Sequence, residues 1–164
     1  MNLDKLKEQI ERIKDHKSRL EYFDNKFSKI ILIGNGGSNA IASHISVDYT
    51  KFLGKKSFSF SDAPMLTAYI NDYGRDEAYK QFLSEFVDDD TFVILISSSG
   101  NSMNVVNAAK WCEANNVYYA ALSGFGANNK LNSLNANYKF WVDAKSYGIV
   151  ELTHEILLHS IIDN

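Results

Sequence analysis

Two continuous apolar runs, each ending in a turn rich in glycine or serine, constrain the fold of this chain most. "KIILIG" at residues 29–34 leads into "GNGGSN", and "TFVILIS" at residues 91–97 leads into "SSSGNS". Apolar runs without polar alternation are typical of strands that are buried on both faces, as in a parallel sheet. We therefore expect a parallel sheet with helices packed over both of its faces.

The rest of the chain alternates between strand and helix patterns. No repeat, low-complexity tract or linker divides the 164 residues. This order predicts one α/β domain over residues 1–164, a three-layer αβα sandwich with a five-stranded parallel, flavodoxin-like sheet. The further strands are expected at residues 56–60, 117–124 and 137–143, and the helices at 38–53, from "SDAP" onward, 75–86, 99–115 and 150–162.

The first 27 residues predict an amphipathic helix, because apolar residues recur at helical spacing between lysines and glutamates. Such a helix needs a surface to pack against, and we expect it to contact another subunit. The segment is charged throughout and has no apolar core of signal-peptide length. The recurring apolar residues are Leu3, Leu6, Ile10, Ile13, Leu20 and Phe23.

Charge and cysteine content exclude several partners. The net charge of −3 gives no reason to expect binding to nucleic acid or to a membrane surface. No apolar run approaches the roughly 20 residues that a membrane span requires. The one cysteine, Cys112, lies in a helical pattern and is expected in the core, and its isolation fits a reducing cytoplasm.

The two turns predict a ligand site, because ligands in such sheets bind beyond the carboxyl ends of the strands. Glycine lets a backbone approach an anion, serine donates hydrogen bonds, and a helix start favours negative charge. Neither turn matches the G-x-x-x-x-G-K-[ST] or G-x-G-x-x-G nucleotide patterns. Each could be only a turn, but two together favour a small phosphorylated or polyhydroxyl ligand, and Asn35 and Asn101 suit a sugar.

Histidines and carboxylates form a second constellation. His44 and Asp48 lie four residues apart on one helix face, and residues 151–159 hold two histidines and two glutamates. These groups could bind zinc or a similar ion, or act as base and acid without metal. Glu151 and His159 would lie about 12 Å apart on a straight helix, so spacing favours the pair of Glu155 and His159. On spacing alone, the pair at 44 and 48 is more often a satisfied hydrogen bond than a set of metal ligands.

His16 and His154 are the remaining histidines. We expect His16 to be solvated on the charged N-terminal helix. His154 belongs to the histidine and carboxylate stretch on the last helix.

Together these motifs resemble the sugar isomerase (SIS) domain family, and specifically its phosphoheptose isomerase branch. The resemblance runs from about residue 29 to the end and rests on "GNGGS", "ASHISVD", "NDYG", "ISSSGNS", "LSGFG" and "YGIVELTHEILLH" in that order. It implies a five-stranded parallel sheet, a homotetramer with active sites at subunit interfaces, and one zinc or similar divalent ion in each site.

The resemblance also implies roles for particular residues. Asp48 would be the catalytic base and His159 the acid, and the zinc ligands would be His44, Asp48, Glu151 and His159. The resemblance thus makes Glu151, and not Glu155, the metal ligand. A loop-to-helix transition at "YGIVE" would allow Glu151 and His159 to reach one ion, although a straight helix would keep them about 12 Å apart. The residues implied to contact substrate are Asn35, Gly36, Gly37, Ser38, Asn71, Asp72, Ser97, Ser98, Ser99, Ser102 and Glu151.

Three departures from the family pattern bear on the site. Asp48 stands where the family has glutamate, which withdraws the carboxylate by one methylene. Glu151 stands where the family has glutamine, which adds a negative charge. An arginine common after the second ligand is absent, with Lys51 nearby.

The resemblance implies an aldose–ketose isomerase, with sedoheptulose 7-phosphate converted to D-glycero-D-manno-heptose 7-phosphate through an enediol. Two alternatives are a domain that senses a sugar phosphate without turnover and a protein that docks to a replication initiator. Neither alternative needs two histidines and two carboxylates, which favours the enzyme.

Overall fold

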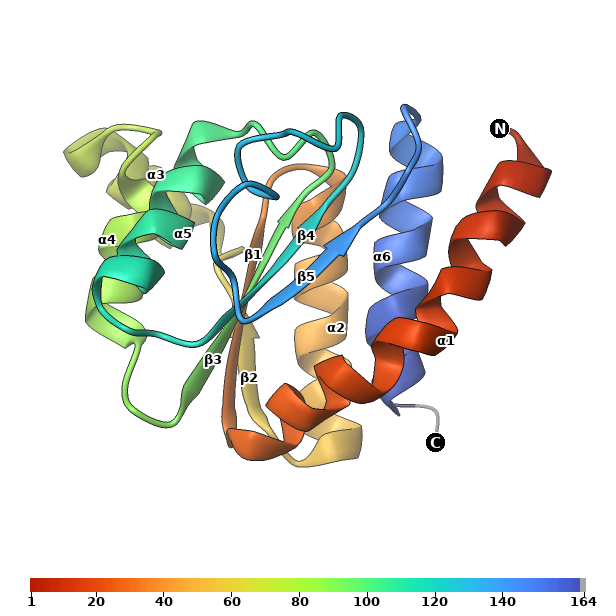
Figure 1. Cartoon of the computed structure of the whole chain (residues 1–164). Coiled ribbons are helices and arrows are strands. Elements are labelled where there is room, and N and C mark those ends of the chain that lie inside the picture. Colours follow the sequence, from red (N-terminus) through yellow and green to blue (C-terminus); the bar gives the residue numbers. More distant parts are fainter. Residues whose placement is uncertain (163–164) are drawn as a thin grey trace.

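The computed structural model describes residues 1–162 and contains one five-stranded sheet in which all neighbouring strands are parallel (Figure 1). The strand order is β2-β1-β3-β4-β5, which is the flavodoxin-like order. The predicted fold class is therefore confirmed. The strands are β1 Lys29–Gly34, β2 Lys56–Ser59, β3 Thr91–Ser97, β4 Tyr119–Ser123 and β5 Tyr138–Trp141.

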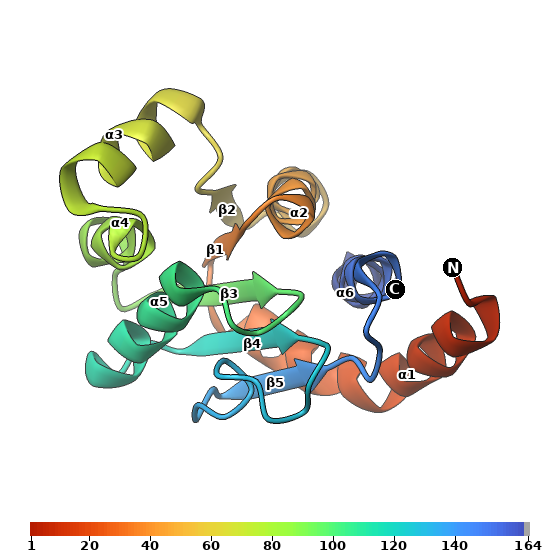
Figure 2. The ribbon, with the colours of Figure 1, turned by 90° about the horizontal axis from the view of Figure 1, so that it is seen from above.

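Helices form a layer on each face of the sheet (Figure 2). In β1, Ile30 and Leu32 join the core on one face, whereas Ile31 and Ile33 join the core on the other. Because both faces are covered, the strand shows no polar alternation. One layer holds α1 Leu3–Lys26, α2 Gly37–Leu53 and α6 Tyr147–Ile162, and the other holds α3 Ala63–Tyr73, α4 Ala78–Phe86 and α5 Met103–Ala114.

Two helix starts near the carboxyl ends of the strands differ from the expectation. The helix predicted from residue 99 begins at Met103, because the chain first turns at Gly100, whose amide donates to Ser97 O at 2.9 Å. The helix predicted from residue 150 begins at Tyr147. Other boundaries agree within a few residues, and Asp62 caps the start of α3 by accepting the amide of Met65 at 3.0 Å.

The N-terminal helix finds its packing surface within the chain. It lies against α6 and β5, with Ile13 and Leu20 in the core. Gln9 is fully buried, and its Oε1 accepts the amide of Asp143 at 2.9 Å. This packing accounts for most of the apolar stripe of α1, although Leu3 at its start is 67% exposed, and the subunit contact stays a prediction.

The expectation that His16 is solvated is wrong. Because α1 crosses β5, the His16 ring is half-buried and meets Phe140 edge-on at 4.8 Å and Tyr138 at 6.1 Å between ring centroids. Burial, with the nearby Arg12 guanidinium, lowers the pKa of His16 below its usual value.

The predicted core position of Cys112 is confirmed: its side chain is fully buried, and burial raises the pKa of the thiol to about 12. Within residues 1–162, no helix has both the length and the apolar character required to traverse a bilayer.

Candidate active site

The two turns singled out in the sequence meet at one edge of the sheet. β1 and β3 are neighbours, and Gly34 pairs with Ile96 at their carboxyl ends. The following helices, α2 and α5, go to opposite layers. This divergence opens the crevice in which doubly wound sheets bind ligands.

Both helices start at this crevice without a side-chain cap. Gly36 is the N-cap of α2 and has φ +54°, a left-handed conformation that favours glycine. Ser102 is the N-cap of α5, and its hydroxyl makes no capping hydrogen bond. Since the first amides of a helix lack partners inside the helix, both starts can donate to an anion.

Between the turns lies a polar cavity of about 240 Å³. Ser38 Oγ and Ser98 Oγ approach to 3.3 Å inside it. Ser97 Oγ is buried and has no hydrogen-bond partner among the described residues, which is unusual for a buried hydroxyl. The cavity is lined by Asn35, Gly36, Gly37, Ser38, Ser97, Ser98, Ser99, Ser102, Tyr147 and Glu151.

Asn35 is fixed by two residues that no sequence motif indicated. Its Oδ1 accepts the Tyr79 hydroxyl at 2.8 Å, and its amide pairs with that of Asn104 at 2.9 Å. Burial raises the pKa of Tyr79 to about 12, so the phenol stays a donor. Asn35 therefore lines the cavity with a side chain that these hydrogen bonds hold in place.

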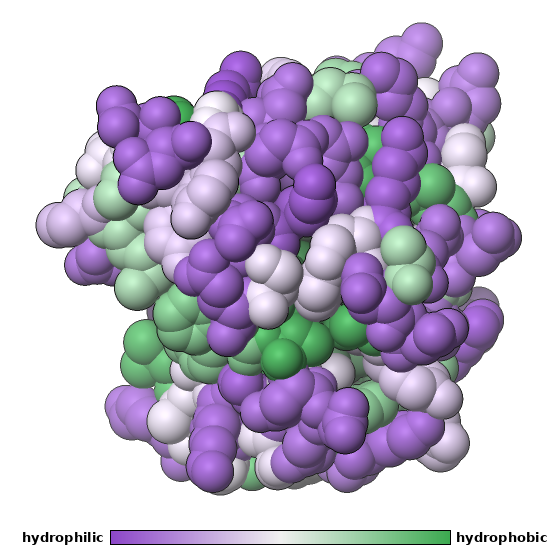
Figure 3. All heavy atoms as spheres, turned by 90° about the vertical axis from the view of Figure 1, so that its left-hand side faces the viewer, coloured by the Kyte–Doolittle hydropathy of each residue, from purple (hydrophilic) through white to green (hydrophobic). Residues whose placement is uncertain are grey.

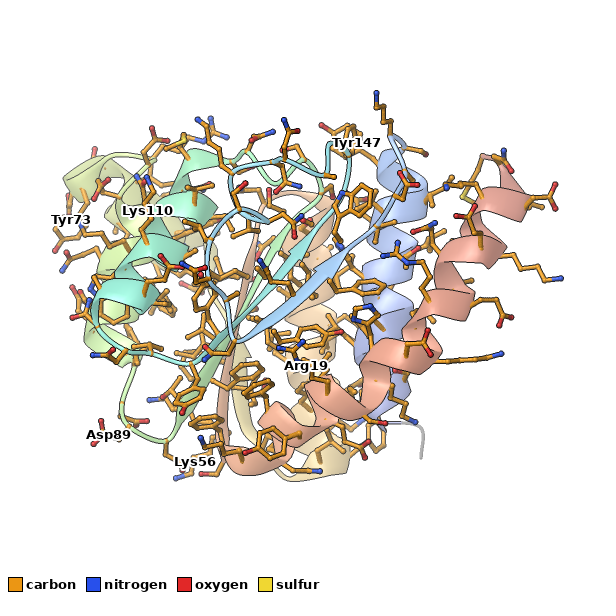
Figure 4. All side chains as sticks on the ribbon, in the orientation of Figure 1. Arg19, Lys56, Tyr73, Asp89, Lys110 and Tyr147 are labelled. Atoms are coloured by element: carbon orange, nitrogen blue, oxygen red, sulfur yellow. The ribbon has the colours of Figure 1, made fainter. Side chains whose placement is uncertain are left out.

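Asn71 and Asp72 are not brought to this cavity. They lie on α3, which has no buried residue, and Asn71 Nδ2 donates to Asp72 Oδ1 at 2.9 Å. The face carrying α3 and α4 shows hydrophobic atoms between hydrophilic ones (Figure 3). Tyr73, which ends α3, lies on the far side of the molecule from Tyr147 (Figure 4).

A compact cluster of histidine and carboxylate groups stands where α2 packs against α6. Asp48 Oδ2 is 3.4 Å from His44 Nε2 and 3.9 Å from His159 Nδ1. One ligand atom from each of the three residues lies within 4.8 Å of the others. The Asp48 side chain is 17% exposed, against 55% for His44, so solvent reaches the cluster from the side of His44.

Glu151 lies outside this cluster. The transition expected at "YGIVE" is wrong, because α6 runs without a break from Tyr147 and keeps Glu151 and His159 eight positions apart on one helix. The Glu151 carboxylate accepts Ser98 Oγ at 3.4 Å and lies over Gly37. Glu155 is also outside the cluster, although both glutamates border the same hollow as His44.

A second hollow, of about 390 Å³, adjoins the serine cavity. Gly37 and Glu151 border both spaces, and His44 borders the second. Of the three cluster residues, His44 alone reaches this hollow, so the cluster meets the site through His44.

His154 belongs to the core and not to the site. It is fully buried, and its Nε2–H donates to Ser123 O at 3.1 Å. Burial lowers its pKa to about 4, so the imidazole is neutral near pH 7.

Tyr147 also lines the cavity, although the sequence motifs did not single it out. Its ring packs on Phe125 with centroids 4.9 Å apart, and the residue is 61% exposed at the start of α6 (Figure 4). The available signal was its place in the "YGIVE" motif, four residues before Glu151.

The fold and this site define a class: doubly wound α/β proteins with a small polar cavity at the switch point of a parallel sheet. The family follows from comparison with known proteins. The SIS domain model matches residues 5–124, and the chain belongs to the SIS domain family.

Individual relatives of this chain are phosphoheptose isomerases. The phosphoheptose isomerase of Fusobacterium nucleatum is 30% identical over 165 residues, which cover 96% of this chain and 84% of that protein. The phosphoheptose isomerase of Aneurinibacillus thermoaerophilus is 32% identical over 149 residues, which cover 87% of this chain and 73% of that protein. The solved phosphoheptose isomerase of Neisseria gonorrhoeae matches with a TM-score of 0.84 at 25% identity over 96% of this chain and 89% of that chain. The predicted resemblance to this branch is confirmed.

Proposed function

We propose that this chain is an aldose–ketose isomerase that converts sedoheptulose 7-phosphate to D-glycero-D-manno-heptose 7-phosphate through an enediol. The relatives named phosphoheptose isomerase support the activity. The observation that carries it for this chain is that the serine cavity adjoins a hollow bordered by His44, a member of the cluster of His44, Asp48 and His159. The cavity suits a phosphorylated polyol, and the cluster supplies groups that a binding module would not need.

The serine turns would bind the substrate. A phosphate at the loop of Ser99 and Ser102 would accept from serine hydroxyls and from the uncapped start of α5. The orphaned hydroxyl of Ser97 supports this assignment, because a bound ligand would give it a partner.

The histidine cluster fits a divalent metal such as zinc. Donor atoms of a tetrahedral zinc site lie about 3.3–3.6 Å apart, given metal–ligand distances of about 2.0–2.2 Å, and the two measured separations from Asp48 are 3.4 and 3.9 Å. His44, Asp48 and His159 would hold the ion, and three protein ligands leave a position open. Zinc bound there would polarise a substrate carbonyl.

Acid–base roles come from the family resemblance. It assigns His159 as the acid and Asp48 as the base, and it also makes both of them ligands. A carboxylate that is held by a metal cannot freely accept a proton from carbon, so the two roles proposed for Asp48 compete.

We further propose a homo-oligomer, a tetramer by resemblance, in which a neighbouring subunit completes the site. Asn71 and Asp72 are remote from the cavity of their own chain, which fits a role in a neighbouring site. The two helices that carry the cluster also expose apolar side chains, namely Val47 at 53% on α2 and Leu152 at 38% on α6, and a second subunit would bury them.

The test is turnover by the purified chain after dialysis against a chelator, with and without added zinc. Proton NMR should detect formation of the aldose phosphate from sedoheptulose 7-phosphate in the zinc-loaded sample, with a large loss in the stripped sample. No aldose phosphate in either sample would refute the isomerase proposal.

A further inference from the structure

We infer that the aromatic ring of Tyr147 binds the carbon chain of the sugar phosphate, and that Phe125 positions this ring. The inference rests on the proposed function, because it concerns how the substrate of that reaction is held between its phosphate and its reacting end. The family resemblance assigns no role to either residue.

Tyr147 supplies the apolar surface of the serine cavity. Among the described residues that line this cavity it alone is aromatic, and the others are glycines or carry hydroxyl, amide or carboxyl groups. Those polar groups suit the phosphate and the hydroxyls of a sugar phosphate. The C–H groups along its carbon chain instead gain from contact with an apolar surface, and an aromatic ring is the usual way in which a small-molecule site provides one.

The position of Tyr147 places the ring along the path of the substrate. Tyr147 is the first residue of α6 (Figure 4), one helical turn before Glu151, so both side chains lie on the same face of the helix. Glu151 borders the serine cavity and the adjoining hollow of His44, whereas Tyr147 borders the serine cavity alone. A substrate with its phosphate at the serine turns and its reacting end in the hollow must cross this cavity, and its carbon chain then passes the ring.

The ring is held in place before a ligand binds. A single exposed tyrosine on a protein surface is ordinary, but the ring of Tyr147 packs on Phe125 with centroids 4.9 Å apart. Phe125 in turn packs against the core, and its amide donates to Ala144 O at 2.9 Å, in the segment that leads into α6. A ring that is already ordered loses little conformational freedom when it binds a ligand.

The backbone of Phe125 supports a role for its side chain. Its φ of +57° lies in the left-handed region, which is a strained conformation for a bulky residue and a common one for glycine. The turn alone therefore does not explain a phenylalanine at this position, whereas the contact with Tyr147 does. Strain of this kind is concentrated at ligand-binding sites, where the surrounding structure holds it.

The test compares two ligands that share a phosphate and differ in the carbon chain. One is inorganic phosphate, and the other is the polyol phosphate obtained by reducing the ketone of sedoheptulose 7-phosphate, which cannot isomerise. In calorimetric titrations of the zinc-loaded chain, Tyr147→Ala should weaken binding of the polyol phosphate about tenfold, the effect of removing roughly 50–60 Å² of apolar contact. The affinity for inorganic phosphate should not change. Tyr147→Phe keeps the ring and should recover most of the affinity that Tyr147→Ala loses.

The matched control is Tyr22→Ala. Tyr22 is 62% exposed, close to the 61% of Tyr147, and its ring packs on Phe23 with centroids 5.2 Å apart. It lies on α1, outside the serine cavity. Its replacement should leave the affinity for both ligands unchanged.

A double variant tests the positioning role of Phe125. Phe125→Ala alone should weaken binding of the polyol phosphate about threefold, because the ring of Tyr147 must then be ordered on binding. In the Tyr147→Ala background, Phe125→Ala should cause no further loss, since no ring is left to position. A further loss in that background would show that Phe125 does not act through Tyr147.

The outcomes separate the inference from the proposed function, because binding is measured without turnover. Equal affinity of the wild type and Tyr147→Ala for the polyol phosphate would show that the ring does not contact the carbon chain. An equal loss of affinity for both ligands in Tyr147→Ala would show that Tyr147 only shapes the serine turns, which also overturns the inference. A wild type that binds the polyol phosphate but forms no aldose phosphate from sedoheptulose 7-phosphate overturns the proposed function alone.

Discussion

The carboxylate of Glu151 lies directly over the backbone of Gly37. A Cβ added at residue 37 would stand 2.5 Å from Oε2 and 2.6 Å from Cδ of Glu151, which is closer than non-bonded atoms approach. The first residue of α2 and the second turn of α6 are therefore in contact across the mouth of the site. This contact sets where the one carboxylate of the cavity lies.

Replacing Gly37 by alanine should displace Glu151 without unfolding the chain. Alanine is a better helix former than glycine, so the start of α2 should persist, and the added methyl should push the carboxylate away from Ser98. We expect at least a tenfold fall in kcat, with the zinc content unchanged. Steady-state kinetics and metal analysis check this, and a variant with wild-type kcat would show that the contact does not position Glu151.

Replacing Ser97 by alanine should weaken ligand binding but not stability. Its buried hydroxyl has no partner among the described residues, so its removal should change the free energy of unfolding by less than about 1 kcal/mol in either direction. Affinity for the sugar phosphate should fall about tenfold, the usual effect of losing a hydrogen bond to a charged group. Urea unfolding and calorimetric titration measure the two quantities.

The matched control for Ser97 is Ser46→Ala. Ser46 is a buried serine on α2 whose hydroxyl donates to Ser43 O at 2.8 Å, away from the serine cavity. Its substitution should leave the affinity unchanged. Equal losses of affinity in the two variants would contradict a role of Ser97 in binding.

The buried imidazole of His154 should make the protein less stable as the pH falls. Its pKa is about 4 in the folded chain, against 6.5 when it is exposed, so the unfolded chain binds more protons between these values and stability is lost as the pH falls from 6.5 to 4. By pH 5 the loss should reach about 2 kcal/mol. His154→Gln retains a donor for Ser123 O and should lack this loss.

Urea unfolding of both proteins at pH 7.5, 6 and 5 measures the effect as a difference, because the carboxylates titrate alike in both. The free energy of unfolding of the wild type should fall by about 2 kcal/mol more than that of His154→Gln between pH 7.5 and pH 5. Parallel curves would contradict the assignment of a neutral, buried His154.

The sheet could be predicted from the sequence because its signals are local. The runs at residues 29–34 and 91–97 are apolar without polar alternation. This pattern is typical of strands that are covered by helices on both faces. The turns follow the strands directly, so their meeting at one edge follows from parallel pairing. Cys112 was predictable for the same reason: a small apolar residue in a helical pattern belongs to the core.

What could not be predicted depends on how the helices pack. The half-buried position of His16 requires knowing that α1 crosses β5, which no spacing rule gives. Helical spacing did indicate that Glu151 and His159 lie far apart, but only the start of α6 at Tyr147 shows that the helix is unbroken between them. Tyr79 and Asn104 hold Asn35 from other elements, and such long-range hydrogen bonds leave no motif.

The metal assignment makes a separate prediction at Asp48. Asp48→Asn keeps the shape of the side chain but removes the charge that stands between two histidines. Zinc affinity should therefore fall by at least about 100-fold, more than the loss typical when a residue that only orients a ligand is replaced. The control is Asp89→Asn, since Asp89 is an exposed aspartate at the opposite end of the sheet from Tyr147 (Figure 4). Calorimetric titration of the metal-free proteins with zinc should show a single site per chain in the wild type and in Asp89→Asn. Wild-type zinc affinity in Asp48→Asn would show that the cluster is not the metal site.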